Sequence, residues 1–297
     1  MSPRRDPRDD AGADGRHERE AAHRAPPPGD RSPACSGRVV FVGAGPGSAD
    51  LITLRGARWL ARAEVVLVDA LADPALLALA PQARWIDVGK RGYGRATAQA
   101  AIDALLVHFA RRHRVVVRLK GGDPSLFGRL EEELAAVAAH GIEAEVVPGV
   151  TAACAAAAEL KRPLTRRGRG RSVVMATAVG AEGMLPAGRR ADTEVCYMAG
   201  RRLAQLGGRL RAAGWPPQSP VVVVSNAGSA DARTSVHRLD ALADAAELHG
   251  GRPTVVTVGA GAAPVAPQPV LQAAALSRPR MPALAPLARG EAPVAPA

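Results

Sequence analysis

The chain has 297 residues, a formal net charge of +11, 47% apolar residues and only 3% aromatic residues. This length suits one large domain or two moderate ones, whose cores Ala, Val and Leu must fill. No apolar run is long enough to cross a membrane, and no signal-peptide core opens the chain. The three cysteines lack CxxC or His-linked spacing, so we expect no structural metal and no disulfide framework. Cys154 and Cys196 stand among apolar residues and are expected in the core. Without disulfides, a cytoplasmic protein is expected.

The two ends of the chain differ from its middle. Residues 1–36 mix Arg, Asp, Pro and Ala without periodicity, which predicts a disordered tail. Residues 263–297 contain eight prolines, which predicts a flexible tail. The seven Arg and seven acidic residues of 1–36 cancel, and residues 263–297 add +2, so residues 37–262 carry +9. Such a charge suits nucleic acid or a small polyacid, although a solvated basic surface without a partner is equally consistent with it.

Val-rich runs alternate with helical patterns between these tails, which predicts an α/β fold. We expect an N-terminal α/β domain over 37–148, a C-terminal α/β domain over 149–262 and a ligand cleft between them. The Arg-rich stretch 162–171 is expected to be a loop. The expected strands lie near 38–43, 65–69, 84–88, 114–119, 143–147, 172–177, 193–197, 220–225, 233–237 and 253–259. The expected helices lie near 53–62, 74–80, 96–112, 125–140, 151–160, 201–213 and 240–248.

The first strand leads into a glycine-rich loop at residues 43–48, and the second ends at Asp69. This arrangement mimics a dinucleotide-binding fingerprint, but Ser48 stands where the third glycine belongs, which makes nicotinamide binding a minor alternative. No Gly-Lys-Ser/Thr follows, which excludes a P-loop. Asp69 is expected at the carboxyl end of its strand, either facing the ligand cleft or acting as a helix cap or solvated turn residue.

The most informative stretch is 118–129, Arg-Leu-Lys-Gly-Gly-Asp-Pro-Ser-Leu-Phe-Gly-Arg. Arg118 and Lys120 alternate along a strand and therefore share one face. The two glycines that follow let backbone amides approach a ligand without a Cβ in the way. Asp123 and Pro124 predict a helix cap and first turn, with Gly141 as the helix stop. A well-capped turn alone would not require adjacent glycines flanked by cations.

This run closely resembles the signature of the tetrapyrrole methylase family, in its uroporphyrinogen-III C-methyltransferase branch. The resemblance extends over residues 38 to about 260. Other segments that match the family in order are 43–47 (Gly-Ala-Gly-Pro-Gly), 89–91 (Gly-Lys-Arg), 148–152 (Pro-Gly-Val-Thr-Ala) and 197–200 (Tyr-Met-Ala-Gly, with one added Ala). Three positions depart from it: Ala70 replaces an Arg, Arg166 a His and Ser225 a Glu.

The resemblance implies a tetrapyrrole-methylase-like fold and S-adenosylmethionine-dependent methylation of uroporphyrinogen III at C2 and C7. The product would be precorrin-2, a precursor of siroheme and cobalamin. It also implies a homodimer. With the tetrapyrrole as the anionic partner, we expect no metal, no nucleic-acid partner and no membrane partner. The charge of +9 on residues 37–262 would suit a substrate with eight carboxylates. Arg118, Lys90 and the arginines of the loop 162–171 are the candidates to bind and clamp those carboxylates.

The same resemblance assigns site residues. The catalytic candidates are Asp69, Lys90 and Arg118, and Asp69 and Lys90 are better proton acceptors than an arginine. Thr151 is expected to cap the helix that follows it. The expected cofactor neighbours are Pro46, Gly121, Gly122, Asp123, Leu126, Thr151, Ala152, Met198 and Ala227.

Two other functions stay open from the sequence. The chain could be another methylase of this fold, acting on a cobalt-corrin intermediate or on ribosomal RNA. It could instead be a tetrapyrrole or cofactor binder without turnover, because of the changes at Ala70 and Ser225. A fused dehydrogenase–chelatase domain is not expected, since 36 residues precede the first strand.

Overall fold

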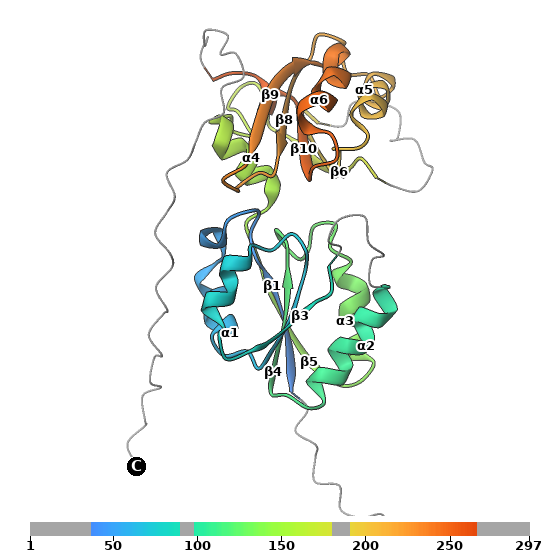
Figure 1. The fold of residues 1–297 in the computed structure, drawn as a ribbon. Coiled ribbons are helices and arrows are strands. Elements are labelled where there is room, and N and C mark those ends of the chain that lie inside the picture. Colours follow the sequence, from blue (N-terminus) through green and yellow to red (C-terminus); the bar gives the residue numbers. More distant parts are fainter. Residues whose placement is uncertain (1–36, 90–97, 180–190, 266–297) are drawn as a thin grey trace, which may run out of the picture. The chain divides into compact units, whose positions relative to one another are not determined.

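Two five-stranded sheets with their helices make up the described part of the chain, in the computed structural model shown in Figure 1. The structure describes residues 37–89, 98–179 and 191–265, all within one compact unit. The first sheet is formed by residues 38–147 and the second by residues 173–259. Both halves are α/β, as the sequence predicts. No helix among the described residues is long and apolar enough to cross a membrane.

The first sheet is entirely parallel and has the strand order β3-β2-β4-β1-β5. Its connections include α1 (Leu54–Leu60), α2 (Gln99–Ala110) and α3 (Leu130–Ala138). Two 3₁₀ helices, η1 (Ala49–Leu51) and η2 (Pro74–Leu79), lie in its loops. The strands are β1 (Arg38–Gly43), β2 (Val65–Val68), β3 (Arg84–Asp87), β4 (Val115–Lys120) and β5 (Glu143–Val147).

The central strands are apolar on both faces because helices cover both faces of this sheet. Val40 and Leu119 face α1, in a cluster that includes Leu60. Phe41 and Leu67 face α2 and α3, in a second cluster. Figure 1 shows α1 on one side of the sheet and α2 and α3 on the other. Each fully buried Val, Leu or Phe contributes about 1.5–3 kcal/mol to stability.

The second sheet is mixed, with the order β6-β7-β10-β8-β9, and only β6 and β7 are parallel. Its strands are β6 (Val173–Thr177), β7 (Thr193–Tyr197), β8 (Pro220–Ser225), β9 (Arg233–Arg238) and β10 (Thr254–Gly259). The accompanying helices are α4 (Ala152–Leu160), α5 (Leu203–Ala212), η3 (Leu239–Ala245), α6 (Ala246–His249) and η4 (Ala260–Ala262).

All ten expected strands form, but three expected helices differ. Residues 74–79 and 239–245 are 3₁₀ rather than α-helical. The helix expected from residue 125 begins only at Leu130. Phe127 and Arg129 have φ angles of 54° and 55°, in the left-handed region that a right-handed helix cannot contain. The prediction for Cys154 was also wrong, because this side chain is exposed, whereas Cys196 is buried as expected.

Candidate functional site

The loops that follow β1 and β4 lie side by side at the carboxyl edge of the first sheet. The Gly45 amide donates to the Gly122 carbonyl at 3.2 Å, and the Gly122 amide donates to the Gly45 carbonyl at 2.9 Å. The chain after β1 leads to α1 on one face, and the chain after β4 leads to α3 on the other. Neighbouring strands whose connections diverge in this way form the crevice where open α/β sheets bind ligands.

Close backbone packing explains several glycines at this edge. A Cβ on Gly43 would lie 2.6 Å from Gly149 Cα, and one on Gly149 would lie 2.3 Å from the Gly122 carbonyl oxygen. Gly122 is different. Its φ is +67°, and the nearest atom to a Cβ there would be the Val150 oxygen at 4.0 Å. Beside Gly122 the backbone therefore borders open space, as a ligand that approaches the main chain requires.

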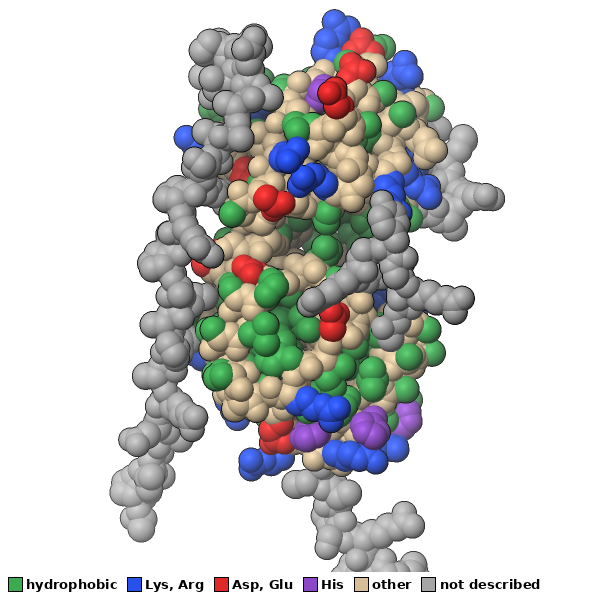
Figure 2. Space-filling view, in the orientation of Figure 1, with side chains coloured by type: hydrophobic (Ala, Val, Ile, Leu, Met, Phe, Trp, Pro, Cys, Tyr) green, Lys and Arg blue, Asp and Glu red, His purple; other side chains and the backbone are tan. Residues whose placement is uncertain are grey.

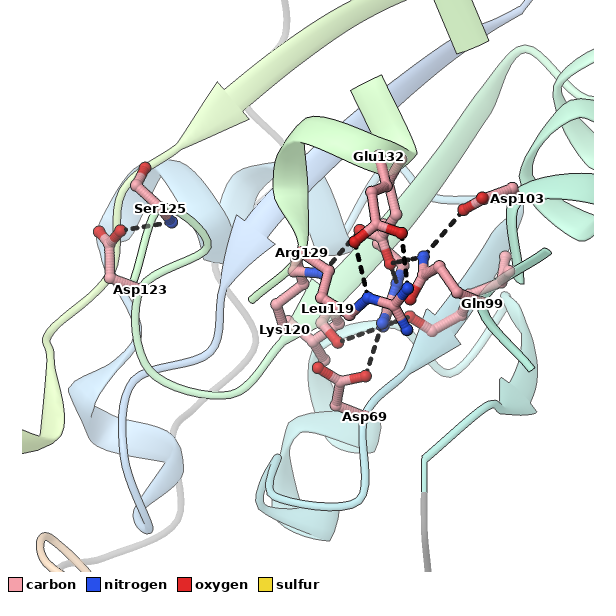
Figure 3. A network of polar contacts seen from close by, with 12 residues as sticks. Asp69, Gln99, Asp103, Leu119, Lys120, Asp123, Ser125, Arg129 and Glu132 are labelled. Carbon is pink, nitrogen blue, oxygen red and sulfur yellow. Dashed lines mark hydrogen bonds and ion pairs between the residues drawn. The ribbon is translucent and has the colours of Figure 1, made fainter. Parts of the chain in front are cut away.

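Asp123 joins two loops instead of capping a helix. Its Oδ1 accepts a hydrogen bond from the Ser125 amide at 2.8 Å (Figure 3). Its Oδ2 accepts one from the Gly149 amide at 2.9 Å. The predicted cap was wrong, because the segment after Pro124 turns through left-handed residues before α3 begins. Asp123 thus fixes the loop after β4 to the loop after β5, with Leu126 half-buried in the same turn.

Pro46 and Ala227 are both expected to contact the cofactor, and they belong to two loops that pack against each other. A Cβ on Gly47 would lie 2.4 Å from the Ser229 amide nitrogen, and one on Gly228 would lie 2.1 Å from the Pro46 carbonyl oxygen. Both Pro46 and Ala227 are buried. The loops after β1 and β8 therefore bring together two residues that are far apart in the sequence.

Thr151 occupies the N-cap position of α4, but its side chain makes no capping hydrogen bond. Its Oγ1 lies instead 2.5 Å from the Tyr197 hydroxyl, so the predicted side-chain cap was wrong. The Tyr197 ring contacts the Phe127 ring, with 5.1 Å between the centroids. Burial raises the pKa of Tyr197, which keeps its hydroxyl protonated. Sequence reasoning did not select these two aromatic residues, although Phe127 lies within the signature run and the chain has only three Phe.

Met198 lies just beyond β7 and is not a core residue. It has a φ of 57°, and 46% of its surface is exposed. Ala152, at the start of α4, is half-buried. Gly121 is constrained differently from Gly122, because a Cβ on it would meet Leu71 Cβ at 2.9 Å.

A buried ionic network lies beneath this edge of the sheet (Figure 3). Arg118 and Lys120 share one face of β4, as predicted, and each is 2% exposed. Arg118 Nε donates to Glu133 Oε1 at 3.0 Å, and Lys120 Nζ donates to Glu133 Oε2 at 2.6 Å. Arg118 Nη2 donates to Asp69 Oδ1 at 2.6 Å, and Arg118 Nη1 donates to the Leu67 and Leu119 carbonyl oxygens. Two cations and two carboxylates therefore compensate one another.

This network changes the expectation for Arg118. Its guanidinium is enclosed and already bonded, so it does not reach outward to clamp a ligand carboxylate. Asp69, whose side chain is 30% exposed, is the member that reaches the surface. Burial, and then the charge of Arg118, lower the pKa of Lys120, while Glu133 opposes this shift. The sequence reasoning missed Glu133; its only signal was an acidic residue in the helical pattern after the signature run.

Other expected cations fall outside this cluster. Lys90 lies outside the described residues. In the loop 162–171, Arg162 donates to the Ala262 carbonyl and Arg166 to the Ala263 and Pro264 carbonyls. Arg166 therefore binds the main chain, which weakens its case as a substrate clamp. On the face drawn in Figure 2, Lys and Arg side chains lie in several separate places. Among the described residues no group of His, Cys, Asp and Glu could hold a metal ion.

Comparisons with known proteins agree with this geometry. The sequence profile of the tetrapyrrole (corrin/porphyrin) methylases matches residues 38–243. A uroporphyrinogen-III C-methyltransferase of Pseudomonas aeruginosa is 40% identical over 240 residues, which cover 79% of this chain and 98% of that enzyme. A siroheme synthase of Neisseria meningitidis serogroup B is 41% identical over 75% of this chain, which spans only 47% of that longer protein.

A solved structure gives the same result. The uroporphyrin-III C-methyltransferase of Thermus thermophilus, in complex with S-adenosylhomocysteine, matches with a TM-score of 0.65 and 38% identity. The match covers 76% of this chain and 98% of the Thermus chain.

Proposed function

Because the chain belongs to the tetrapyrrole methylase family, we propose that it methylates uroporphyrinogen III at C2 and C7, with S-adenosylmethionine as donor. The product is precorrin-2. The observation that carries this proposal is the 40% identity to the Pseudomonas aeruginosa enzyme over nearly its whole length. The named activity of that relative, and the S-adenosylhomocysteine held by the Thermus thermophilus enzyme, are consistent with the glycine-lined edge of the first sheet.

The residues around Gly122 fit such a donor. The space beside Gly122, where a Cβ would meet no atom closer than 4.0 Å, admits a ligand against the main chain. We assign its contacts to Gly121, Gly122, Asp123 and Leu126, with Pro46, Thr151, Ala152, Met198 and Ala227 around them. The sulfonium supplies an already activated methyl group, so the task of the protein is mainly alignment of the reacting atoms.

The proton that the macrocycle loses after methylation needs an acceptor. Asp69 is our first candidate, because it is ionisable, partly exposed and anchored through one oxygen by Arg118. Lys90 stays a second candidate. Arg118 acts through Asp69 in this scheme, since its own protons are strongly held. The +9 charge of residues 37–262 attracts an octacarboxylate to the site.

The larger organisation is also part of the proposal. We propose a ligand site between an N-terminal domain, residues 37–148, and a C-terminal domain, residues 149–262. A homodimer is expected from the family resemblance, and the cysteine usage favours a cytoplasmic protein. Sedimentation of the full chain tests the dimer: a sedimentation coefficient typical of a 30.6 kDa monomer would contradict it.

The deciding experiment is incubation with uroporphyrinogen III and methyl-labelled S-adenosylmethionine under reducing, anaerobic conditions. The proposal predicts a tetrapyrrole that carries two labelled methyl groups. Donor binding without any transfer would contradict the proposal and favour the binder. No transfer to uroporphyrinogen III, together with label in ribosomal RNA in a parallel incubation with ribosomes, would contradict it and favour the RNA methylase. A singly methylated product that accumulates would place the defect at the second transfer.

A further inference from the structure

Glu133 is a fully buried carboxylate in the first turn of α3. Its neighbours Glu131 and Glu132 are exposed, whereas Glu133 has no accessible surface. Each of its oxygens accepts a hydrogen bond from a cationic side chain of β4: Oε1 from Arg118 and Oε2 from Lys120. The Gln99 amide nitrogen lies 3.4 Å from Oε1 and donates to Asp103 at 2.8 Å.

A carboxylate in this position costs free energy unless it is fully paired. Apolar residues would fill the same space between α3 and β4 at lower cost, so core packing does not require a charge here. Arg118, Lys120 and Glu133 alone carry a net charge of +1. Asp69 completes a neutral set through its bond to Arg118 and is the member that reaches the surface.

The planar guanidinium of Arg118 contacts both Glu133 and Asp69, so the position of Glu133 affects that of Asp69. Its Nε edge is held by Glu133, and Nη1 is held by the Leu67 and Leu119 carbonyl oxygens. These contacts set the direction of Nη2, which donates to Asp69 Oδ1 at 2.6 Å. Because the guanidinium is rigid, loss of the Nε contact would let it rotate and release that oxygen.

We infer that Glu133 is a positioning residue for the methyl-transfer reaction, through the contact series Glu133–Arg118–Asp69. It fixes Arg118 so that one oxygen of Asp69 is anchored and the carboxylate keeps a defined orientation toward the proton it accepts. Lys120 balances the second oxygen of Glu133. This inference rests on the proposed function, in which Asp69 handles that proton.

The test compares Glu133→Gln with the control Glu132→Gln. Glu132 is exposed and, within the part of the chain that the structure describes, pairs with Arg129, so its change should leave turnover as in the wild type. We expect Glu133→Gln to lower kcat by about tenfold or more, the effect of losing one charge-assisted contact. Donor affinity should stay within about twofold, because Glu133 does not border the Gly122 space. The acid limb of the pH–rate profile should also move, which a merely structural role would not cause.

A second variant keeps the test decisive if Glu133→Gln fails to fold. Lys120→Met combined with Glu133→Gln removes one cation and one anion, so the buried set stays neutral. The inference predicts that kcat stays low in this double variant, since Arg118 still lacks its charged anchor. Wild-type kcat in either folded variant would overturn the inference.

A readout without turnover separates the two proposals. If the wild type transfers no methyl group, the proposed function fails, and the inference is judged by ¹³C NMR of the Asp69 carboxyl carbon. At a fixed pH its chemical shift should change in Glu133→Gln, because the released Asp69 oxygen loses its hydrogen bond from Arg118, and should stay unchanged in Glu132→Gln. The other ionisable groups near this set, among the described residues, are Asp103 on α2, which shares Gln99 with Glu133, and Arg129 at the start of α3. An unchanged Asp69 signal in Glu133→Gln overturns the inference.

Discussion

The backbones of Gly45 and Gly122 exchange two hydrogen bonds, at 3.2 and 2.9 Å, and so join the first loop of the first sheet to the loop after β4. This pairing holds the chain after Gly122 close to Gly43 and Gly149, where any Cβ would clash. At Gly122, by contrast, a Cβ would meet no atom closer than the Val150 carbonyl oxygen at 4.0 Å. The proposed binding of the donor at this edge depends on that asymmetry.

Gly122→Ala should weaken binding of S-adenosylmethionine by about tenfold or more, because the new methyl group enters the proposed donor space. The left-handed backbone adds a cost of about 1–2 kcal/mol to folding. Gly141→Ala is the matched control, since Gly141 has a φ of +66° and no atom within 4 Å of a Cβ. Thermal unfolding should show that the two variants are destabilised equally. Equilibrium dialysis should show a loss of donor affinity in Gly122→Ala alone. Equal affinities in the two variants would contradict the site.

Asp123→Ala should abolish detectable donor binding, since it removes the acceptor that fixes the Gly149 amide and a predicted polar contact. Asp123→Asn retains one oxygen and should keep part of the affinity. The comparison is made by dialysis with labelled donor on variants shown to be folded by circular dichroism. An Asp123→Ala protein with the wild-type dissociation constant would remove this residue from the site.

Arg118→Lys should fold and bind the donor within about twofold of the wild type, while kcat falls by about tenfold or more, because lysine lacks the rigid fork. Arg118→Ala should lose about 3–5 kcal/mol of unfolding free energy, since Glu133 would keep a buried charge with one fewer partner. Denaturant unfolding and steady-state kinetics check both statements. Full activity in Arg118→Lys would exclude a role for the guanidinium.

His249 should make the stability of the chain depend on pH. Burial and the charges of neighbouring cationic groups lower its pKa from 6.5 to about 4. Between these values the unfolded chain binds more protons than the folded chain, so the unfolding free energy falls as the pH decreases from 6.5 to 4. The folded ring is bonded to Ser225 and Ser235, at 2.9 and 2.8 Å. Urea unfolding across this range should show a shallower slope for His249→Gln.

His140 is the control for that experiment, because it is exposed. The His140→Gln variant should keep the wild-type slope. Identical slopes in all three proteins would show that the Ser225–His249–Ser235 contacts carry no pH-dependent stability.

The central strands β1, β2 and β4 of the first sheet were predictable because they are short Val-rich runs, which a parallel sheet covered on both faces requires. In the second sheet β8 and β10 are Val-rich in the same way. The shared face of Arg118 and Lys120 followed from the two-residue period of a strand. The partner of both, Glu133, was not predictable. Its pairing depends on how α3 is rotated over β4, which tertiary packing decides.

The turn after Pro124 shows a second limit. Asp123-Pro124 is a good helix start, but Gly128 lies so close to the Pro124 carbonyl that a Cβ there would approach its oxygen to 2.7 Å. The chain therefore turns through Phe127 and Arg129 before α3 begins. Likewise, Thr151 has the right position for a helix cap, but its hydroxyl forms a hydrogen bond with the Tyr197 hydroxyl of the second sheet instead. At Thr151 a contact between distant segments overrides the local preference, whereas after Pro124 the turn itself does.

The most direct test of the donor site is a calorimetric titration of the wild-type chain with S-adenosylhomocysteine. The Gly45–Gly122 pairing and the open side of Gly122 predict saturable binding with one site per chain, and Gly122→Ala should reduce it while Gly141→Ala should not. A folded wild-type protein that gives no binding heat at any accessible concentration or temperature would contradict the account.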